Sequence, residues 1–93
     1  MIKQVYAIFD LKSGYYMPDL ITLENDDVAK RWFDSYLHSV LDSNPNAPIV
    51  MYPSDFELRC LGTFDFYDAI TAVFDSPVPI CKACSFIFST KEE

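Results

Sequence analysis

Apolar residues occupy both faces of the first segment of the chain. Residues 2–10 are rich in β-branched and aromatic side chains, and both alternating sets are apolar, which is typical of a central strand. Residues 12–14, with a glycine, predict a tight turn, after which residues 15–17 return to extended structure. Pro18 ends that piece or confines it to a sheet edge, and residues 20–23 are expected to form a short extended continuation.

A helical pattern follows this extended region. Asn25 is a suitable N-cap, and Asp26 and Asp27 fall in the first turn, where the helix dipole favours negative charge. The apolar residues then recur at helical spacing along one stripe: Val28, Ala29, Trp32, Phe33, Tyr36, Leu37, Val40 and Leu41. This pattern predicts one amphipathic helix, which ends in the Pro- and Asn-rich loop at residues 43–48.

The second half of the chain predicts strands. Residues 49–52 are expected to be a brief extended segment, and a longer strand begins at Asp55. Residues 66–69 indicate a turn, residues 70–74 a further strand, residues 76–79 a kinked connection, and residues 80–89 a last strand or strand pair. The strand after Asp55 is expected to place Phe56, Leu58, Cys60 and Phe64 on one side and Glu57, Arg59 and Thr63 on the other.

These elements predict a single α+β domain over residues 1–93, with a frayed tail from about residue 90. The expected order is β-β-α-β-β-β, in which the amphipathic helix packs on one face of an antiparallel sheet of about five strands. Because a domain this short has a small core and sheet edges that need covering, a homodimer is also expected.

The charge of the chain limits its partners. Seven Lys and Arg against fourteen Asp and Glu give a net charge of −7, which disfavours a general nucleic-acid coat protein, because such proteins neutralise phosphates with basic groups. No apolar run is long enough to span a bilayer, and the start lacks the layout of a signal peptide. We therefore expect no membrane association and a cytoplasmic location.

The cysteines and the single histidine are the obvious candidates for chemistry. Cys81 and Cys84 have the spacing of a zinc-binding or redox pair, and Cys60 and His38 could complete a zinc site. However, the spacings match no common zinc finger, and no helix is predicted after Cys84 to activate a thiol. Cysteines acting as small hydrophobic residues are therefore the favoured interpretation. With no catalytic signature elsewhere, we expect no metal, no cofactor and no enzymatic activity.

Aromatic and basic residues near the start of the chain suggest a different kind of site. Tyr15 and Tyr16 follow Lys12 on the predicted hairpin and lie near Lys3, with Arg59 as an additional candidate. Single-stranded nucleic acid is bound by this combination, because bases stack on rings while basic side chains contact phosphates. The alternative, favoured by the residues alone, is that these tyrosines form half-buried cross-strand pairs.

Two longer segments carry a family resemblance. The first is K-Q-V-Y-A-I-F-D at residues 3–10 with K-S-G-Y at residues 12–15, and the second is Y-P-S-D-F-E-L-R-C-L-G-T-F-D at residues 52–65. They resemble the small nonstructural protein of gokushoviruses, which are microvirus-type phages with single-stranded DNA genomes. In that family, K-x-V-Y-A-I-x-D opens the chain and P-x-D-F-E-L-x-x-L-G-x-F-D follows the helix.

The resemblance implies a function that composition does not. It implies a protein that is absent from the virion, is made in the cytoplasm of the infected bacterium, and acts in viral DNA replication, in the switch to single-stranded DNA synthesis or packaging. Weak or complex-dependent binding of single-stranded DNA would then involve Lys3, Lys12, Tyr15, Tyr16 and Arg59. The alternative is an acidic interaction module that binds a phage or host replication protein without contacting DNA.

Overall fold

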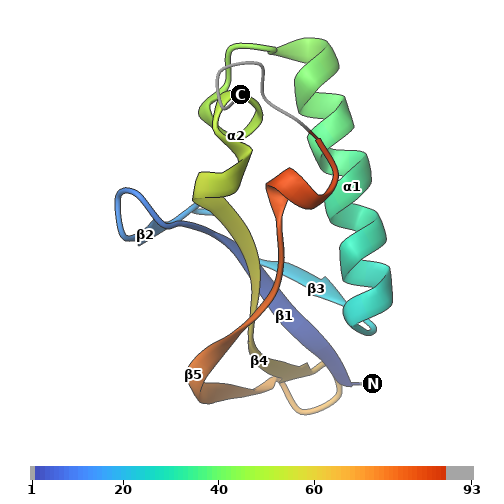
Figure 1. Ribbon diagram of the computed structural model, residues 1–93. Helices are drawn as coiled ribbons and strands as arrows, with labels where there is room; N and C mark the ends of the chain where they lie inside the picture. Colours follow the sequence, from blue (N-terminus) through green and yellow to red (C-terminus); the bar gives the residue numbers. More distant parts are fainter. Residues whose placement is uncertain (1, 88–93) are drawn as a thin grey trace.

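The computed structural model describes residues 2–87 and shows a five-stranded antiparallel sheet with one long helix (Figure 1). The strands are β1 (Ile2–Asp10), β2 (Tyr15–Tyr16), β3 (Ile21–Leu23), β4 (Phe56–Asp65) and β5 (Ile70–Lys82). The helices are α1 (Asp26–Ser43), the short α2 (Pro48–Met51) and the 3₁₀ turns η1 (Pro53–Asp55) and η2 (Ala83–Ser85). The predicted fold class, α+β with an antiparallel sheet of about five strands and one main helix, is confirmed.

Strand β1 lies in the middle of the sheet. The strand order is β2-β1-β4-β5, and β3 also pairs with β1. Pairing with β4 extends along the whole of β1, from Ile2 opposite Asp65 to Asp10 opposite Phe56. Residues 5–8 of β1 are all buried, which agrees with the apolar character of both alternating sets of side chains.

Helix α1 covers one face of the sheet and builds the core with it. Its apolar stripe buries Ala29, Phe33 and Leu37 completely, against Tyr6 and other side chains of β1 and β4. Full burial of a side chain such as Phe33 contributes about 2–3 kcal/mol. No helix within residues 2–87 has both the length and the hydrophobicity needed to cross a membrane.

The ends of α1 follow the capping rules. The Asn25 side chain accepts a hydrogen bond from the backbone N–H of Val28 at 2.9 Å, as the sequence predicted. Near the same end, the Tyr6 hydroxyl donates to Asp26 Oδ1 at 2.7 Å. Burial of the hydroxyl is the larger cause that raises the pKa of Tyr6, and this hydrogen bond to the Asp26 carboxylate is the second.

The segment after the helix differs from the prediction. Residues 48–51 form the short helix α2, whereas an extended segment was predicted for residues 49–52. Pro48 occupies a first-turn position, where its missing N–H removes no helical hydrogen bond, and Ile49 and Val50 are buried in the core. Core packing of these two side chains therefore outweighs their β propensity.

The end of the chain also differs from the prediction. β5 continues through residues 76–79, where a kinked connection was predicted, and ends at Lys82 before η2. Pro77 and Pro79 are tolerated because β5 is an edge strand with register irregularities against β4. Three strands precede α1 and two follow it, whereas the predicted order β-β-α-β-β-β had two strands before the helix and three after it. The rest of the predicted last strand, residues 88–89, and the tail from residue 90 lie outside the described residues.

A β-bulge changes which side chains share a face. Cys60 opposes Tyr6 and Gly62 opposes Val5, so Leu61 is an extra residue in β4. Beyond this point Phe64 opposes Lys3 and lies on the face away from α1, although the alternation from Asp55 predicted it on the same side as Cys60. The prediction was wrong because strict alternation fails at a bulge.

Candidate nucleic-acid interface

The face of the sheet opposite α1 carries the candidate site. Tyr6 and Ile8 of β1 pack into the core under α1, so alternate residues of that strand point to the opposite face. Residues that oppose each other in antiparallel strands share a face, which adds side chains from β2 and β4. This open face contains Lys3, Val5, Ala7 and Phe9 of β1, Tyr16 of β2, and Glu57, Arg59 and Phe64 of β4.

One end of the open face holds a cluster around Arg59. The rings of Phe9 and Tyr16 lie 4.7 Å apart, and the guanidinium carbon of Arg59 lies 3.8 Å from the centre of the Phe9 ring. Arg59 Nη1 donates to the Tyr16 hydroxyl at 3.3 Å, and Nε donates to Glu57 Oε2. Glu57 is only 6 % exposed, so the guanidinium neutralises a buried carboxylate.

The electrostatics of this cluster keep Arg59 charged. Burial acts against its ionisation, but the hydrogen bonds to Tyr16 and Glu57 and the charge of Glu57 outweigh that effect and raise the pKa of Arg59. Glu57 neutralises part of the charge of the Arg59 guanidinium. Arg59 is therefore better suited to stacking its planar group on a ring than to binding a phosphate as an unpaired cation. It also holds the Tyr16 ring in place on the open face.

Tyr15 and Tyr16, the two tyrosines predicted to bind DNA, do not share a face at the hairpin tip. Tyr16 opposes Phe9 and Tyr15 opposes Asp10, so the two adjacent rings lie on opposite faces of the sheet. Tyr15 is 75 % exposed and Tyr16 is 38 % exposed. Lys12 is exposed in the turn, where its N–H donates to Asp10 Oδ1 at 2.9 Å. Only Tyr16 is therefore part of the open face.

Lys3 lies at the other end of the open face and has aromatic neighbours of its own. It is six residues from Phe9 along β1, which corresponds to roughly 20 Å. Its Nζ atom lies 6.0 Å from the centre of the Phe66 ring, and Phe66 packs edge-on to Phe64 with centroids 4.8 Å apart. Phe66 is 50 % exposed. This second aromatic–basic pair was not predicted from the sequence, because its position depends on the bulge.

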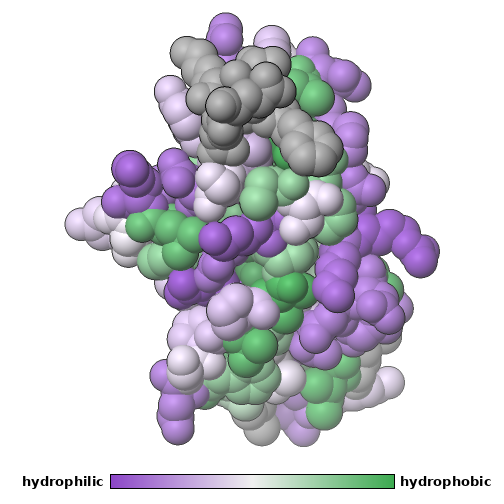
Figure 2. All heavy atoms as spheres, viewed as in Figure 1, coloured by the Kyte–Doolittle hydropathy of each residue, from purple (hydrophilic) through white to green (hydrophobic). Residues whose placement is uncertain are grey.

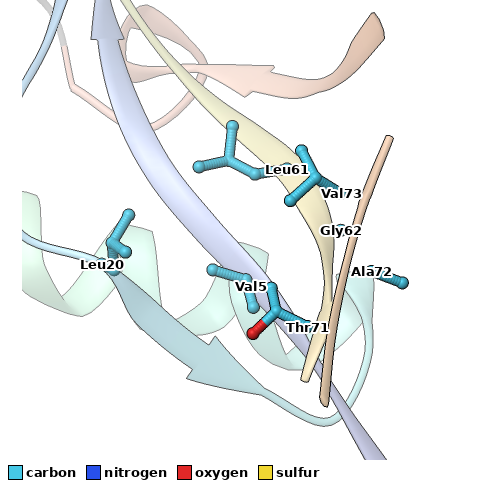
Figure 3. Close-up of a pocket in the computed structure, with 7 residues that line it drawn as sticks. All are labelled: Val5, Leu20, Leu61, Gly62, Thr71, Ala72 and Val73. Carbon is cyan, nitrogen blue, oxygen red and sulfur yellow. The ribbon is translucent and has the colours of Figure 1, made fainter. Parts of the chain in front are cut away.

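An apolar hollow lies between the two ends of the open face (Figure 3). Its volume is about 140 Å³, close to that of a cavity that holds one benzene-sized group. In Figure 3 the side chains of Val5 and Leu61 are on the side of the sheet away from the helix. The hollow is lined by Val5, Leu20, Leu61, Gly62, Thr71, Ala72 and Val73.

The cysteines and the histidine do not form a site on this face. Cys60 is buried on the α1 side, and burial raises its pKa. Burial also raises the pKa of Cys81, to about 11, an effect that Lys30 partly offsets. His38 is exposed on α1 and contacts Asp34, four residues earlier.

The positions of the three cysteines and His38 do not support a metal centre. Within residues 2–87, no three His, Cys, Asp or Glu side chains are grouped so that they could hold a metal ion. The structure does not bring Cys60, Cys81, Cys84 and His38 together in such a group. All three thiols are free cysteines.

The fold and the open face define a small α+β domain whose uncovered sheet presents aromatic and basic side chains. A family model described as Phage ORF5 protein matches residues 3–86, a range that includes all five strands except Ile2 and both ends of the open face. The chain therefore belongs to the Phage ORF5 protein family and is a phage protein. Comparisons with curated proteins and with solved structures found no match.

Proposed function

We propose that this phage protein is a nonstructural accessory protein of viral DNA replication that binds single-stranded DNA weakly on its open sheet face. In this proposal the protein comes from a gokushovirus-type phage and is located in the cytoplasm of the infected bacterium rather than in the virion. It acts in the switch to single-stranded DNA synthesis or packaging. The proposal assigns no catalytic step to the protein. The observation that carries it is a pair of aromatic–basic groups at the two ends of one uncovered sheet face.

The chemistry of these groups fits single-stranded DNA better than a duplex. Exposed rings such as Tyr16 and Phe66 can stack with bases, which contributes about 1–3 kcal/mol per base and depends little on sequence. A base on an open sheet is accessible only when it is unpaired. In this proposal, Lys3 at one end and Lys12 at the hairpin tip would contact phosphates on either side of the stacked bases.

The number of basic groups predicts the strength of binding. With two or three phosphate contacts, the slope of log K against log salt should be about −1.4 to −2.1, since each contact to a single strand contributes roughly −0.7. The net charge of −7 repels DNA further. Binding should therefore be weak alone, and stronger when another protein supplies positive charge.

Fluorescence anisotropy with a labelled oligothymidine, at low and at physiological salt, tests the proposal. We expect Tyr16→Ala and Phe66→Ala each to weaken binding about 5- to 150-fold, as the loss of one stacked base predicts. Tyr15→Ala is the matched control, because Tyr15 is the adjacent exposed tyrosine on the opposite face. Equal losses in Tyr15→Ala and Tyr16→Ala would place the DNA at the hairpin tip instead of the open face.

A second candidate function is an acidic module that binds a phage or host replication protein without contacting DNA. The pairing of Arg59 with Glu57 favours it, because this pairing removes one of the few cations from the open face. Absence of oligothymidine binding at low salt would reject the DNA proposal. Association with the phage replication initiator, measured by calorimetry with purified proteins, would then support the module.

A further inference from the structure

The outer edge of β5 is the longest unpaired edge of the sheet. β5 has 13 residues and is the last strand in the order, with β4 on one side and none of the described strands on the other. On the opposite side of the sheet, β2 and β3 have only two and three residues. An open strand edge is a template on which another strand can pair.

The first part of β5 lacks the features that block such pairing. Residues 70–74 contain no charged side chain, although the chain as a whole carries −7. Val73 is 74 % exposed and Phe74 is 38 % exposed. Figure 2 shows hydrophobic groups at the surface near the lower end of the molecule, where the β4–β5 ribbon lies. Edge strands usually carry charges or prolines as protection, and here prolines 77 and 79 protect only the second part of the strand.

We propose that two copies of this chain join through residues 70–74 of β5, in antiparallel pairing around a twofold axis perpendicular to the sheet. A twofold interface must be self-complementary, and an uncharged antiparallel edge meets that condition. The chain as a whole, with fourteen acidic and seven basic side chains, carries a net charge of −7 that repels a second copy. The uncharged edge is therefore where a second copy meets the least repulsion.

The side-chain pattern fixes the register. Residues opposed in an antiparallel pair point to the same face, so a twofold axis perpendicular to the sheet must relate one residue to its own copy. Centring the axis on Ala72 places Val73 opposite Thr71 of the second copy and Phe74 opposite Ile70 of the second copy, so that all five residues of the uncharged segment are paired. A centre at Thr71 would leave only residues 70–72 of β5 to pair, because residues 66–69 form the turn before the strand. A centre at Val73 would bring the charged Asp75 into the paired region, opposite Thr71 of the second copy.

This arrangement has a consequence for the open face. Because the axis is perpendicular to the sheet, both open faces lie on the same side of the dimer and both α1 helices lie on the other. Val73 of the second copy then lies beside Thr71, at the rim of the apolar hollow. If the open face binds DNA, as proposed above, the dimer presents one continuous surface of twice the length.

Sedimentation velocity over a micromolar to millimolar concentration series tests the dimer without DNA, so its outcome is independent of the proposed function. We expect Val73→Lys to raise the dimer dissociation constant at least tenfold. Val78→Lys is the matched control, since it makes the same change at an exposed residue of the same strand, between the two prolines. A monomeric wild type, or equal effects of the two substitutions, would overturn the proposal. Circular dichroism confirms that each variant is folded.

A cross-linking experiment tests the register. At a self-opposed position the Cα atoms of the two copies are about 4.5–5.5 Å apart, which is within the range that a disulfide spans. In a chain with Cys81→Ser and Cys84→Ser, Ala72→Cys should therefore oxidise to a covalent dimer, and Val78→Cys should not. Cross-linking of Val78→Cys alone, or of neither variant, would contradict pairing centred on Ala72.

Discussion

Replacing Gly62 by alanine tests the close approach of β4 and β5. A Cβ atom built on Gly62 would lie 1.9 Å from the carbonyl oxygen of Ala72 and 2.9 Å from both the carbonyl carbon of Ala72 and the Cα of Val73. Ordinary van der Waals contact begins at 3.4 Å, so the oxygen would have to move by about 1.5 Å. All three atoms belong to the backbone, and no side-chain rotation can relieve the overlap.

We expect this substitution to destabilise the protein by about 3 kcal/mol or more, at or above the upper end of the usual cost of overpacking. For a domain of this size, such a loss lowers Tm by roughly 12–24 °C. Thermal and urea unfolding followed by circular dichroism measure it. The matched control is Gly14→Ala, where nothing lies within 4 Å and the only cost, about 1–2 kcal/mol, comes from the positive φ of 79°. Equal losses in the two variants would refute the proposed clash.

Three further predictions concern other parts of the structure. Tyr6→Phe removes the hydrogen bond to Asp26 and should cost about 1.5 kcal/mol in urea unfolding, whereas an unchanged midpoint would show that the bond contributes nothing. The pKa of Cys81, about 11, should make its alkylation at pH 8 on the order of 100-fold slower than that of an ordinary thiol of pKa 9. The same shift links stability to pH, because the thiol of the unfolded chain ionises at a lower pH than the thiol of the folded protein. The stability that the neutral Cys81 thiol contributes is therefore complete below pH 9 and is lost as the pH rises to 11. Glu57→Gln removes the charge that neutralises Arg59, so fluorescence anisotropy should show tighter binding of oligothymidine. The slope of log K against log salt should also become steeper by about 0.7. An unchanged slope would show that Arg59 does not reach phosphate.

The elements that local sequence specifies were predicted well. Helix α1 combines an N-cap with a continuous apolar stripe, and β1 is apolar on both faces, so short-range patterns determine both. By contrast, α2 depends on packing of Ile49 and Val50 into a core that residues far along the chain supply. Extension of β5 through Pro77 likewise depends on its position at the edge, which is a property of the sheet rather than of the segment.

The candidate site was predicted only in part, for a similar reason. The sequence placed Tyr16 and Arg59 among the candidates, and the structure brings them within hydrogen-bonding distance, although 43 residues separate them. It did not reveal Phe66 beside Lys3, because the bulge at Leu61 decides which face the residues beyond it occupy. Gly62 was the one local signal, since a glycine inside a strand often marks a bulge or a close backbone approach.

Charge connects the open face with the proposed dimer. A chain of net charge −7 can bind DNA only where its few basic groups face the same way, and Lys3 and Arg59 do so on the open face. One copy still provides too few cations for tight binding, since a single strand needs several neutralised phosphates. Pairing through β5 would double the number of cations on one side of the assembly, and the paired segment itself, residues 70–74, adds no charge. The β5 edge that permits association would thus also raise the affinity for a longer DNA strand. The apparent affinity for oligothymidine should therefore increase with protein concentration, in step with dimer formation.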